Sequence, residues 1–171
     1  METFKKCMFL ISIGLMAWLN GNAQTVISGG NVSGKWTKAN SPYNVIGSIT
    51  VAKGTTLEIE PGVTVAFAQD RSLTVNGQLL AQGTSNDNIV FTRQSTNNWS
   101  GLNFSAQGEN ESVVRYASIQ YSNSCGVRIE NGTVTLNYNI ISNNNAGNGL
   151  YYGGGVHISG GKVTLSNTLN P

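Results

Sequence analysis

The 171-residue sequence contains few cysteines, few charged residues and one histidine. Its two cysteines, Cys7 and Cys125, are too few for the disulfide network that holds many small extracellular domains together. Charged residues make up 11% of the chain and the formal net charge is +2, so the sequence lacks the basic surface of a nucleic-acid-binding protein. Packing and hydrogen bonds must therefore hold the fold, and we predict no nucleic-acid partner.

Long apolar runs are also scarce, and the longest lies at the N-terminus. Residues 1–23 contain Lys5 and Lys6, then an apolar stretch at 7–19 and then small polar residues, which is the pattern of a secretory signal peptide cleaved after Ala23. The apolar stretch is shorter than the ~20 residues that a membrane-spanning helix needs, so a membrane anchor is the less favoured interpretation. We therefore expect a secreted or outer-surface protein without a transmembrane segment after cleavage.

Removal of the signal peptide changes the composition of the chain. The net charge falls from +2 to +1, because two lysines and one glutamate are lost, and Cys125 becomes the single cysteine. One cysteine cannot form an internal disulfide. We expect the Cys125 side chain to be buried or half-buried.

The mature sequence is rich in short stretches of alternating apolar and polar residues, separated by Gly, Pro and Asn turn signals. Residues 126–136 recur at 155–165 with every apolar position kept. A weaker copy at 101–105 precedes them at a slightly shorter spacing. Repeats of this length without helices between them predict a solenoid.

Three short strands per repeat predict a triangular coil. We expect the strands to begin at Val45, after an N-terminal cap segment at 24–44 in which Trp36 is the apolar plug, and the coils to fill residues 45–171. Four apolar positions predict that the second coil repeats the first at one constant shift: Ile49 on Leu73, Val51 on Val75, Val65 on Ile89 and Phe67 on Phe91.

The last coil is predicted to be incomplete. Leu169 falls where Ile140 lies one coil earlier, and the sequence stops at Pro171. Either Pro171 is a crude cap, or the sequence is the N-terminal piece of a longer solenoid. We favour the second interpretation, because open strand edges invite aggregation. If the last coil is terminal, its edge could pair with another chain.

Several segments resemble a known group of proteins. They are residues 41–51 (SPYNVIGSITV), 54–67 (GTTLEIEPGVTVAF), 73–77 (LTVNG), 89–92 (IVFT) and 99–104 (WSGLNF). In this order they resemble the N-terminal coils of secreted bacterial right-handed parallel β-helix proteins of the pectin lyase-like group. The resemblance implies an all-β fold, a right-handed single-stranded parallel β-helix. It leaves the activity open, because lyases, hydrolases and adhesins share this fold.

Candidate ligand-facing residues follow from the alternation along the strands. The pattern places one set of apolar side chains inside: Leu102, Val127, Val156, Phe104, Ile129 and Ile158. Asn103, Arg128 and His157 should then stack outside, about 4.8 Å apart, beside a second column of Ser105, Glu130 and Ser159. The resemblance implies that a polysaccharide groove runs over a sheet face of this kind, so Asn103, Arg128, Glu130 and His157 are our main candidates.

Aromatic side chains add a second kind of candidate. Tyr151 and Tyr152 lie in a segment inserted relative to the preceding coil, and Trp99 begins a strand. Aromatic rings stack on the apolar faces of sugar rings, although Trp99 is equally placed to cover the core.

The sequence offers no complete catalytic constellation, so we predict no catalytic residue, metal or cofactor and leave enzymatic activity open. Glycosidases need paired carboxylates. Glu58 and Glu60 share a strand face with about 7 Å between them. A solvated face is the preferred interpretation for this pair, and also for Glu109 and Glu111.

These observations favour a secreted or cell-surface structural or binding module, adhesin-like or carbohydrate-contacting. The expected partner is a polysaccharide or a cell-surface glycan. The alternative is the N-terminal fragment of a polysaccharide lyase or glycoside hydrolase.

Overall fold

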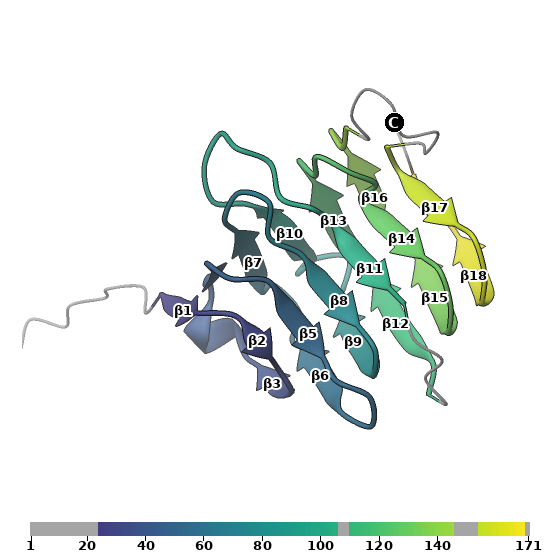
Figure 1. Ribbon diagram of the computed structural model, residues 1–171, viewed down its shortest axis with the longest axis horizontal. Coiled ribbons are helices and arrows are strands. Elements are labelled where there is room, and N and C mark those ends of the chain that lie inside the picture. Colours follow the sequence, from purple (N-terminus) through teal and green to yellow (C-terminus); the bar gives the residue numbers. More distant parts are fainter. Residues whose placement is uncertain (1–23, 106–109, 146–153, 170–171) are drawn as a thin grey trace, which may run out of the picture.

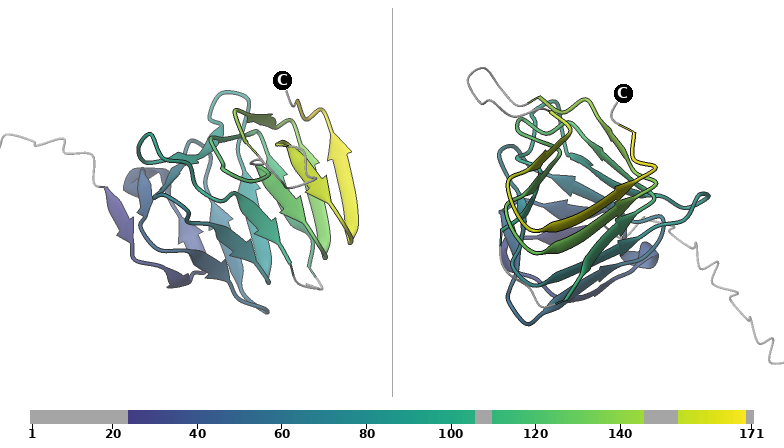
Figure 2. Two further views of the ribbon diagram at one scale, coloured as in Figure 1. Left: turned by 45° about the horizontal axis from the view of Figure 1, so that its top comes forward. Right: turned by 90° about the vertical axis from the view of Figure 1, so that its right-hand side faces the viewer.

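The computed structural model describes residues 24–105, 110–145 and 154–169, which wind into a parallel β-helix (Figure 1). Each coil contributes one strand to each of three sheets, and each sheet has six strands in parallel register with the coils before and after. Viewed from its end, in the right panel of Figure 2, the coils stack around a shared interior. The expected all-β helix with three short strands per coil is confirmed.

The chain visits the three sheets in turn. Sheet A consists of β1 (Thr25–Ile27), β4 (Tyr43–Val45), β7 (Thr64–Phe67), β10 (Ile89–Arg93), β13 (Ala117–Gln120) and β16 (Ile140–Ser142). Sheet B consists of β2 (Gly30–Asn31), β5 (Ile49–Val51), β8 (Leu73–Val75), β11 (Leu102–Phe104), β14 (Val127–Ile129) and β17 (Val156–Ile158). Sheet C consists of β3 (Gly34–Trp36), β6 (Thr56–Ile59), β9 (Gln78–Gln82), β12 (Ser112–Arg115), β15 (Thr133–Asn137) and β18 (Lys162–Ser166). The 3-10 turn η1 (Lys38–Asn40) lies between β3 and β4.

The strands begin at Thr25 rather than at Val45. β1, β2 and β3 pair with β4, β5 and β6, so the segment 24–44 contains a coil of its own, and its role as a cap stays a prediction. Trp36 is 6% exposed and its ring stacks on that of Tyr43, with 4.5 Å between the ring centroids. The expected burial of Trp36 is therefore confirmed.

The strand register confirms most of the predicted repeats and corrects one. Val127 pairs with Val156, and Ile49 pairs with Leu73, as the two repeats predict. Val65, however, pairs with Phe91 instead of Ile89, so the predicted constant shift is wrong in sheet A. The cause is the segment between sheets C and A, which is longer in the second coil (83–88) than in the first (60–63).

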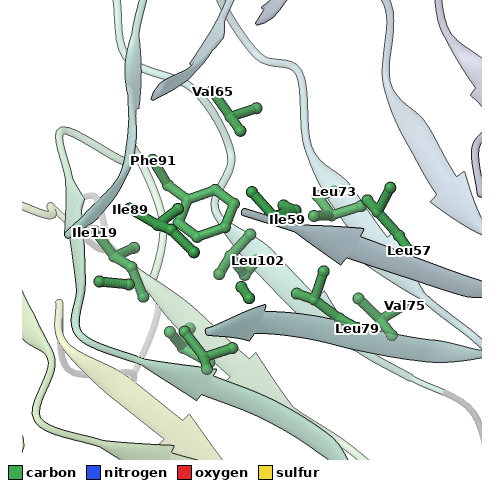
Figure 3. Close-up of a cluster of buried hydrophobic side chains, with 14 of the residues drawn as sticks. Leu57, Ile59, Val65, Leu73, Val75, Leu79, Ile89, Phe91, Leu102 and Ile119 are labelled. Atoms are coloured by element: carbon green, nitrogen blue, oxygen red, sulfur yellow. The ribbon is translucent and has the colours of Figure 1, made fainter. Parts of the chain in front are cut away.

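The interior is a continuous column of apolar side chains from all three sheets, as Figure 3 shows for its middle part. Its largest members are fully buried: Trp99, Phe67, Phe91, Ile49, Leu57, Ile59, Leu73, Leu79, Ile89, Leu102, Ile119 and Ile129. Trp99 stacks on Phe67 with 4.4 Å between the ring centroids, so it covers the core. Cys125 is buried, as expected.

The last described coil is more exposed than those before it. Leu169 bridges to Ile140, as the repeat predicts. Ile158 was expected inside, yet 47% of it is exposed, and the exposed fractions of Leu165 and Leu169 are 50% and 64%. Ile158 continues the inward row of Ile129, but the described residues place no further coil against β17. The register therefore confirms the inward side of Ile158, while its side chain stays partly exposed at the edge of the last described coil.

The predicted signal peptide, residues 1–23, lies outside the described residues. Within the part of the chain that the structure describes, no helix is both long and apolar enough to span a bilayer.

Candidate functional site

The predicted polar column exists on the outward face of sheet B. Asn103 on β11 pairs in register with Arg128 on β14, and Arg128 pairs with His157 on β17. All three are half-exposed, because the strand residues on either side of each belong to the inward rows. Three consecutive coils therefore present an amide, a guanidinium and an imidazole in one line.

Glu130 lies beside this column and pairs with Arg128. The distance from the Arg128 Nη1 to the Glu130 Oε1 is 3.6 Å, and the side chains are 27% and 49% exposed. An ion pair with this exposure contributes roughly 0–1 kcal/mol to stability. The pair therefore stabilises the fold little, but it holds a cation beside a carboxylate on the open sheet face.

The second predicted column consists of the residues that directly follow three sheet B strands: Ser105, Glu130 and Ser159. Backbone hydrogen bonds join these residues to the neighbouring coils. The backbone N–H of Glu130 donates to the carbonyl of Phe104 over 2.8 Å, and that of Ser159 donates to Ile129 over 2.9 Å. The Ser105 hydroxyl donates to the amide oxygen of Asn76 over 2.9 Å. The column thus extends one coil further toward the N-terminus than the sequence pattern indicated.

Tyr151 and Tyr152, the two aromatic candidates in the inserted segment, lie outside the described residues, as does Glu109. Glu111 is exposed and its Oε1 accepts a hydrogen bond from the Thr135 hydroxyl. We therefore build the site from Asn103, Arg128, Glu130 and His157.

The carboxylates Glu58 and Glu60 share one cation, Lys35, and do not form a catalytic pair. The Lys35 ammonium lies 3.1 Å from a carboxylate oxygen of each. Glu60 also accepts a hydrogen bond from the backbone N–H of Lys38, and this bond, together with Lys35, lowers the Glu60 pKa below its ordinary value. Hydrogen bonds and charges from both glutamates raise the Lys35 pKa. A glycosidase acid needs a raised pKa, so this cluster has the opposite electrostatics.

No group of three His, Cys, Asp or Glu side chains that could hold a metal ion occurs among residues 24–105, 110–145 and 154–169.

Sequence reasoning missed a second group of surface residues, at the corner between sheets C and A. The rings of Tyr116 and Tyr138 stack there, with 4.8 Å between their centroids and 4° between their planes. Each tyrosine directly follows a sheet C strand, and the strand residues before them, Arg115 and Asn137, are partners in the register of β12 with β15. Correct alignment of these two strands would therefore have shown the pair.

Asn139 stabilises the same corner from inside and was also missed. It is 1% exposed, its amide nitrogen donates to the Val114 carbonyl over 2.9 Å, and its amide oxygen accepts from the Ala117 N–H over 2.9 Å. Both partners lie one coil earlier, on either side of Tyr116. The amide satisfies backbone groups that the corner removes from the strand ladder.

Comparisons with known proteins agree with this architecture. A family model described as a pectate-lyase-like β-helix domain matches residues 30–119, which is more than half of the chain. A stretch of 58 residues is 45% identical to Protein bark beetle of Drosophila melanogaster; it covers 34% of this chain and 2% of that protein. The chain therefore spans a small fraction of that relative's length. No solved structure matches the chain. By the family match, the chain belongs to the pectate-lyase-like β-helix domains.

Proposed function

We propose that this protein is a secreted or cell-surface β-helix module that binds acidic polysaccharide on the outward face of sheet B. The observation that carries the proposal is the register of Asn103, Arg128 and His157 on three consecutive coils, with Glu130 beside Arg128. The signal-peptide pattern at residues 1–23 supports export from the cell.

The chemistry of the column suits a chain of uronate residues. A guanidinium presents several N–H donors in a plane and binds a carboxylate through two of them. Amide and imidazole groups on the neighbouring coils can donate to or accept from sugar hydroxyls. Strands in a parallel sheet repeat at about 4.8 Å, so a polymer lying across them meets one side chain per coil.

Binding is better supported than hydrolysis, because the carboxylates near each other are engaged by cations. Lys35 holds Glu58 and Glu60, and Arg128 lies beside Glu130. The description of the family as pectate-lyase-like keeps one alternative open, an N-terminal fragment of a polysaccharide lyase or glycoside hydrolase. That alternative predicts product release, which the binding proposal does not.

Affinity electrophoresis of the full chain through gels that contain polygalacturonate tests the proposal. Arg128→Ala removes the cation from the face and should weaken binding about tenfold, the loss expected for one hydrogen bond to a charged group. Lys53→Ala is the matched control, because it removes one positive charge from an exposed turn between β5 and β6. Its affinity should stay within about twofold of the unsubstituted chain, a small long-range effect at physiological salt.

Two outcomes would contradict the proposal: no retardation by polygalacturonate, or equal losses in Arg128→Ala and Lys53→Ala. Ultraviolet absorbance of unsaturated uronides, recorded in the same mixtures, tests the alternative. Product that accumulates with the unsubstituted chain and not with His157→Ala would favour the lyase.

A further inference from the structure

A cavity of about 290 Å³ lies at the corner where sheet C turns into sheet A. One side is the stacked ring pair of Tyr116 and Tyr138, and another is the loop 83–88, which contributes Thr84, Ser85 and Asn88. Because each coil passes from sheet B to sheet C and then to sheet A, this corner lies opposite the sheet B face. The cavity is therefore separate from the site already described.

The backbone gives no reason of its own for tyrosine at this corner. Tyr116 and Tyr138 have φ values of 47° and 53°, in the left-handed region that bulky residues rarely adopt. In the next coil the equivalent residue is Asn167, with a φ of 47°. Asparagine suits this conformation better than tyrosine does. The tyrosines at these two positions are therefore not explained by the backbone conformation, and their contacts with each other and with the cavity are the feature to explain.

The ring stack cannot continue into the preceding coil. Gly83 occupies the corner there, since its N–H donates to the Arg115 carbonyl over 2.8 Å. A Cβ on Gly83 would lie 2.4 Å from the Tyr116 carbonyl oxygen, so no side chain fits. The loop that follows Gly83 and the ring pair both line the cavity.

The loop is fixed by its own contacts. The Lys38 ammonium lies 2.5 Å from an Asp87 carboxylate oxygen. The Asp87 N–H donates to the Thr84 hydroxyl over 3.0 Å, and the Asp87 carbonyl accepts from the N–H groups of Thr84 and Gly62 over 3.1 and 3.0 Å. This side of the cavity is therefore held in place before any ligand arrives, which lowers the entropic cost of binding.

The lining combines flat aromatic and small apolar surface with uncharged polar groups. Ala117 and Ile140 extend the apolar part, while Asn88 and Ser118 add an amide and a hydroxyl. A pyranose ring has the complementary pattern, an apolar C–H face and a rim of hydroxyls. The volume is at the lower limit of small-molecule pockets, which measure about 300–1,000 Å³. A single sugar ring fits this size better than a long chain segment.

We infer that this corner cavity binds a neutral sugar residue, with the Tyr116 and Tyr138 pair as its stacking surface and Asn88 as a hydrogen-bonding group. The inference extends the proposed glycan binding to a second site of different chemistry. Among the described residues, no charged side chain lines the cavity, whereas the sheet B face carries Arg128. Neutral and acidic glycans therefore separate the two sites experimentally.

Isothermal titration of the full chain with cellohexaose, xylohexaose and mannohexaose tests the inference. We expect at least one hexasaccharide to bind, and Tyr138→Asn, which keeps a residue suited to the corner, to weaken that binding about tenfold. Asn88→Ala, in the exposed loop, should weaken it about fivefold. Tyr121→Asn is the matched control: Tyr121 also has a left-handed φ, of 64°, but stacks under Arg93 away from the cavity.

The inference is overturned if none of the three hexasaccharides binds, or if Tyr121→Asn weakens binding as much as Tyr138→Asn does. Thermal unfolding shows whether each variant folds. Should Tyr138→Asn fail to fold, Asn88→Ala decides the question alone, and unchanged affinity in it counts against the site. Polygalacturonate retardation should be the same in all of these variants. Loss of retardation in Arg128→Ala with hexasaccharide binding intact supports two separate sites, while failure of polygalacturonate binding alone overturns only the sheet B proposal.

Discussion

The two halves of this β-helix are stabilised by different chemistry. In residues 24–105 the interior contains two aromatic stacks, Trp36 on Tyr43 and Phe67 on Trp99. No aromatic side chain is buried in residues 110–145 and 154–169, where the interior holds smaller aliphatic groups. There the side-chain amides of Asn139 and Asn144 reach back one coil and bond to backbone groups.

The difference shows that the coils of one β-helix can place aromatic side chains either in the interior or at the outer corners. In the first half, rings fill the interior and contribute burial of apolar surface. In the second half, Tyr116, Tyr121 and Tyr138 lie at corners with left-handed backbone, and amides satisfy the corner from inside. The second half is thus the part whose outer surface carries the tyrosine stack and two of the three residues of the polar column, Arg128 and His157.

The largest expected effect tests the aromatic half. Trp99→Ala should lower the free energy of unfolding by about 3–5 kcal/mol, the range for deletion of a fully buried aromatic side chain. It removes the stack on Phe67 and the 2.8 Å hydrogen bond from the indole N–H to the Gln120 carbonyl. Urea titration followed by circular dichroism measures the change. A loss under about 1 kcal/mol would show that the stack is not what stabilises this half.

A smaller effect is expected for the amide half. Asn139→Ala should lower the free energy of unfolding by about 2 kcal/mol, because a buried N–H and a buried carbonyl lose their partners. Asn86→Ala, in the exposed loop 83–88, is the control and should change it by less than about 0.5 kcal/mol. Equal urea midpoints for the two variants would remove the distinction between the halves.

Truncation of an apolar side chain in the last described coil should lower the free energy of unfolding by a smaller amount. Leu165→Ala is expected to cost about 1 kcal/mol, since half of the side chain is already exposed. Leu136 stacks directly on Leu165 one coil earlier and is fully buried, so Leu136→Ala should cost about 2–5 kcal/mol. Chemical denaturation of both variants makes the comparison. Similar costs would mean that Leu165 is covered in solution, as the predicted edge pairing requires.

The smallest effect is a pH dependence that belongs to the first half. Folding lowers the Glu60 pKa, so the stabilisation from Glu60 is present above its unfolded value of about 4.5 and is lost as the pH falls through the lowered value. Glu60→Gln should therefore flatten the decrease in melting temperature between pH 6 and pH 3. Lys35 has a raised pKa, so its stabilisation is lost only as the pH rises above 10.5. An unchanged acid slope in Glu60→Gln would contradict the role of the cluster.

Much of the fold could be predicted from local patterns. Stretches of alternating apolar and polar residues, separated by Gly, Pro and Asn turn signals, predict the strands. The repeats at 126–136 and 155–165 predict the length of one coil. The shift in sheet A was predicted wrongly because the loop 83–88 is polar and carries no apolar marker of its length. Strands at 25–36 were missed because Gly29, Gly30 and Gly34 interrupt the alternation.

Part of the candidate site could also be predicted from the sequence, and part could not. Asn103, Arg128 and His157 were placed correctly from their repeat positions, since parallel strands in register carry equivalent residues to one line. The engagement of Glu58 and Glu60 by Lys35 was not predicted, because it depends on the pairing of β3 with β6. The corner cavity was not predicted, because it forms only where the loop 83–88 of one coil meets Tyr116 and Tyr138 of the next two coils.

The sequence by itself determined the solenoid, its three strands per coil and the side of each strand that faces outward, because these follow from the strand alternation and from the recurrence of each coil. Only the tertiary structure decided which carboxylates are neutralised, which corner is hollow and which apolar residues stay exposed. These properties depend on contacts between residues of different coils, and the length of each turn determines which residues of neighbouring coils come into contact.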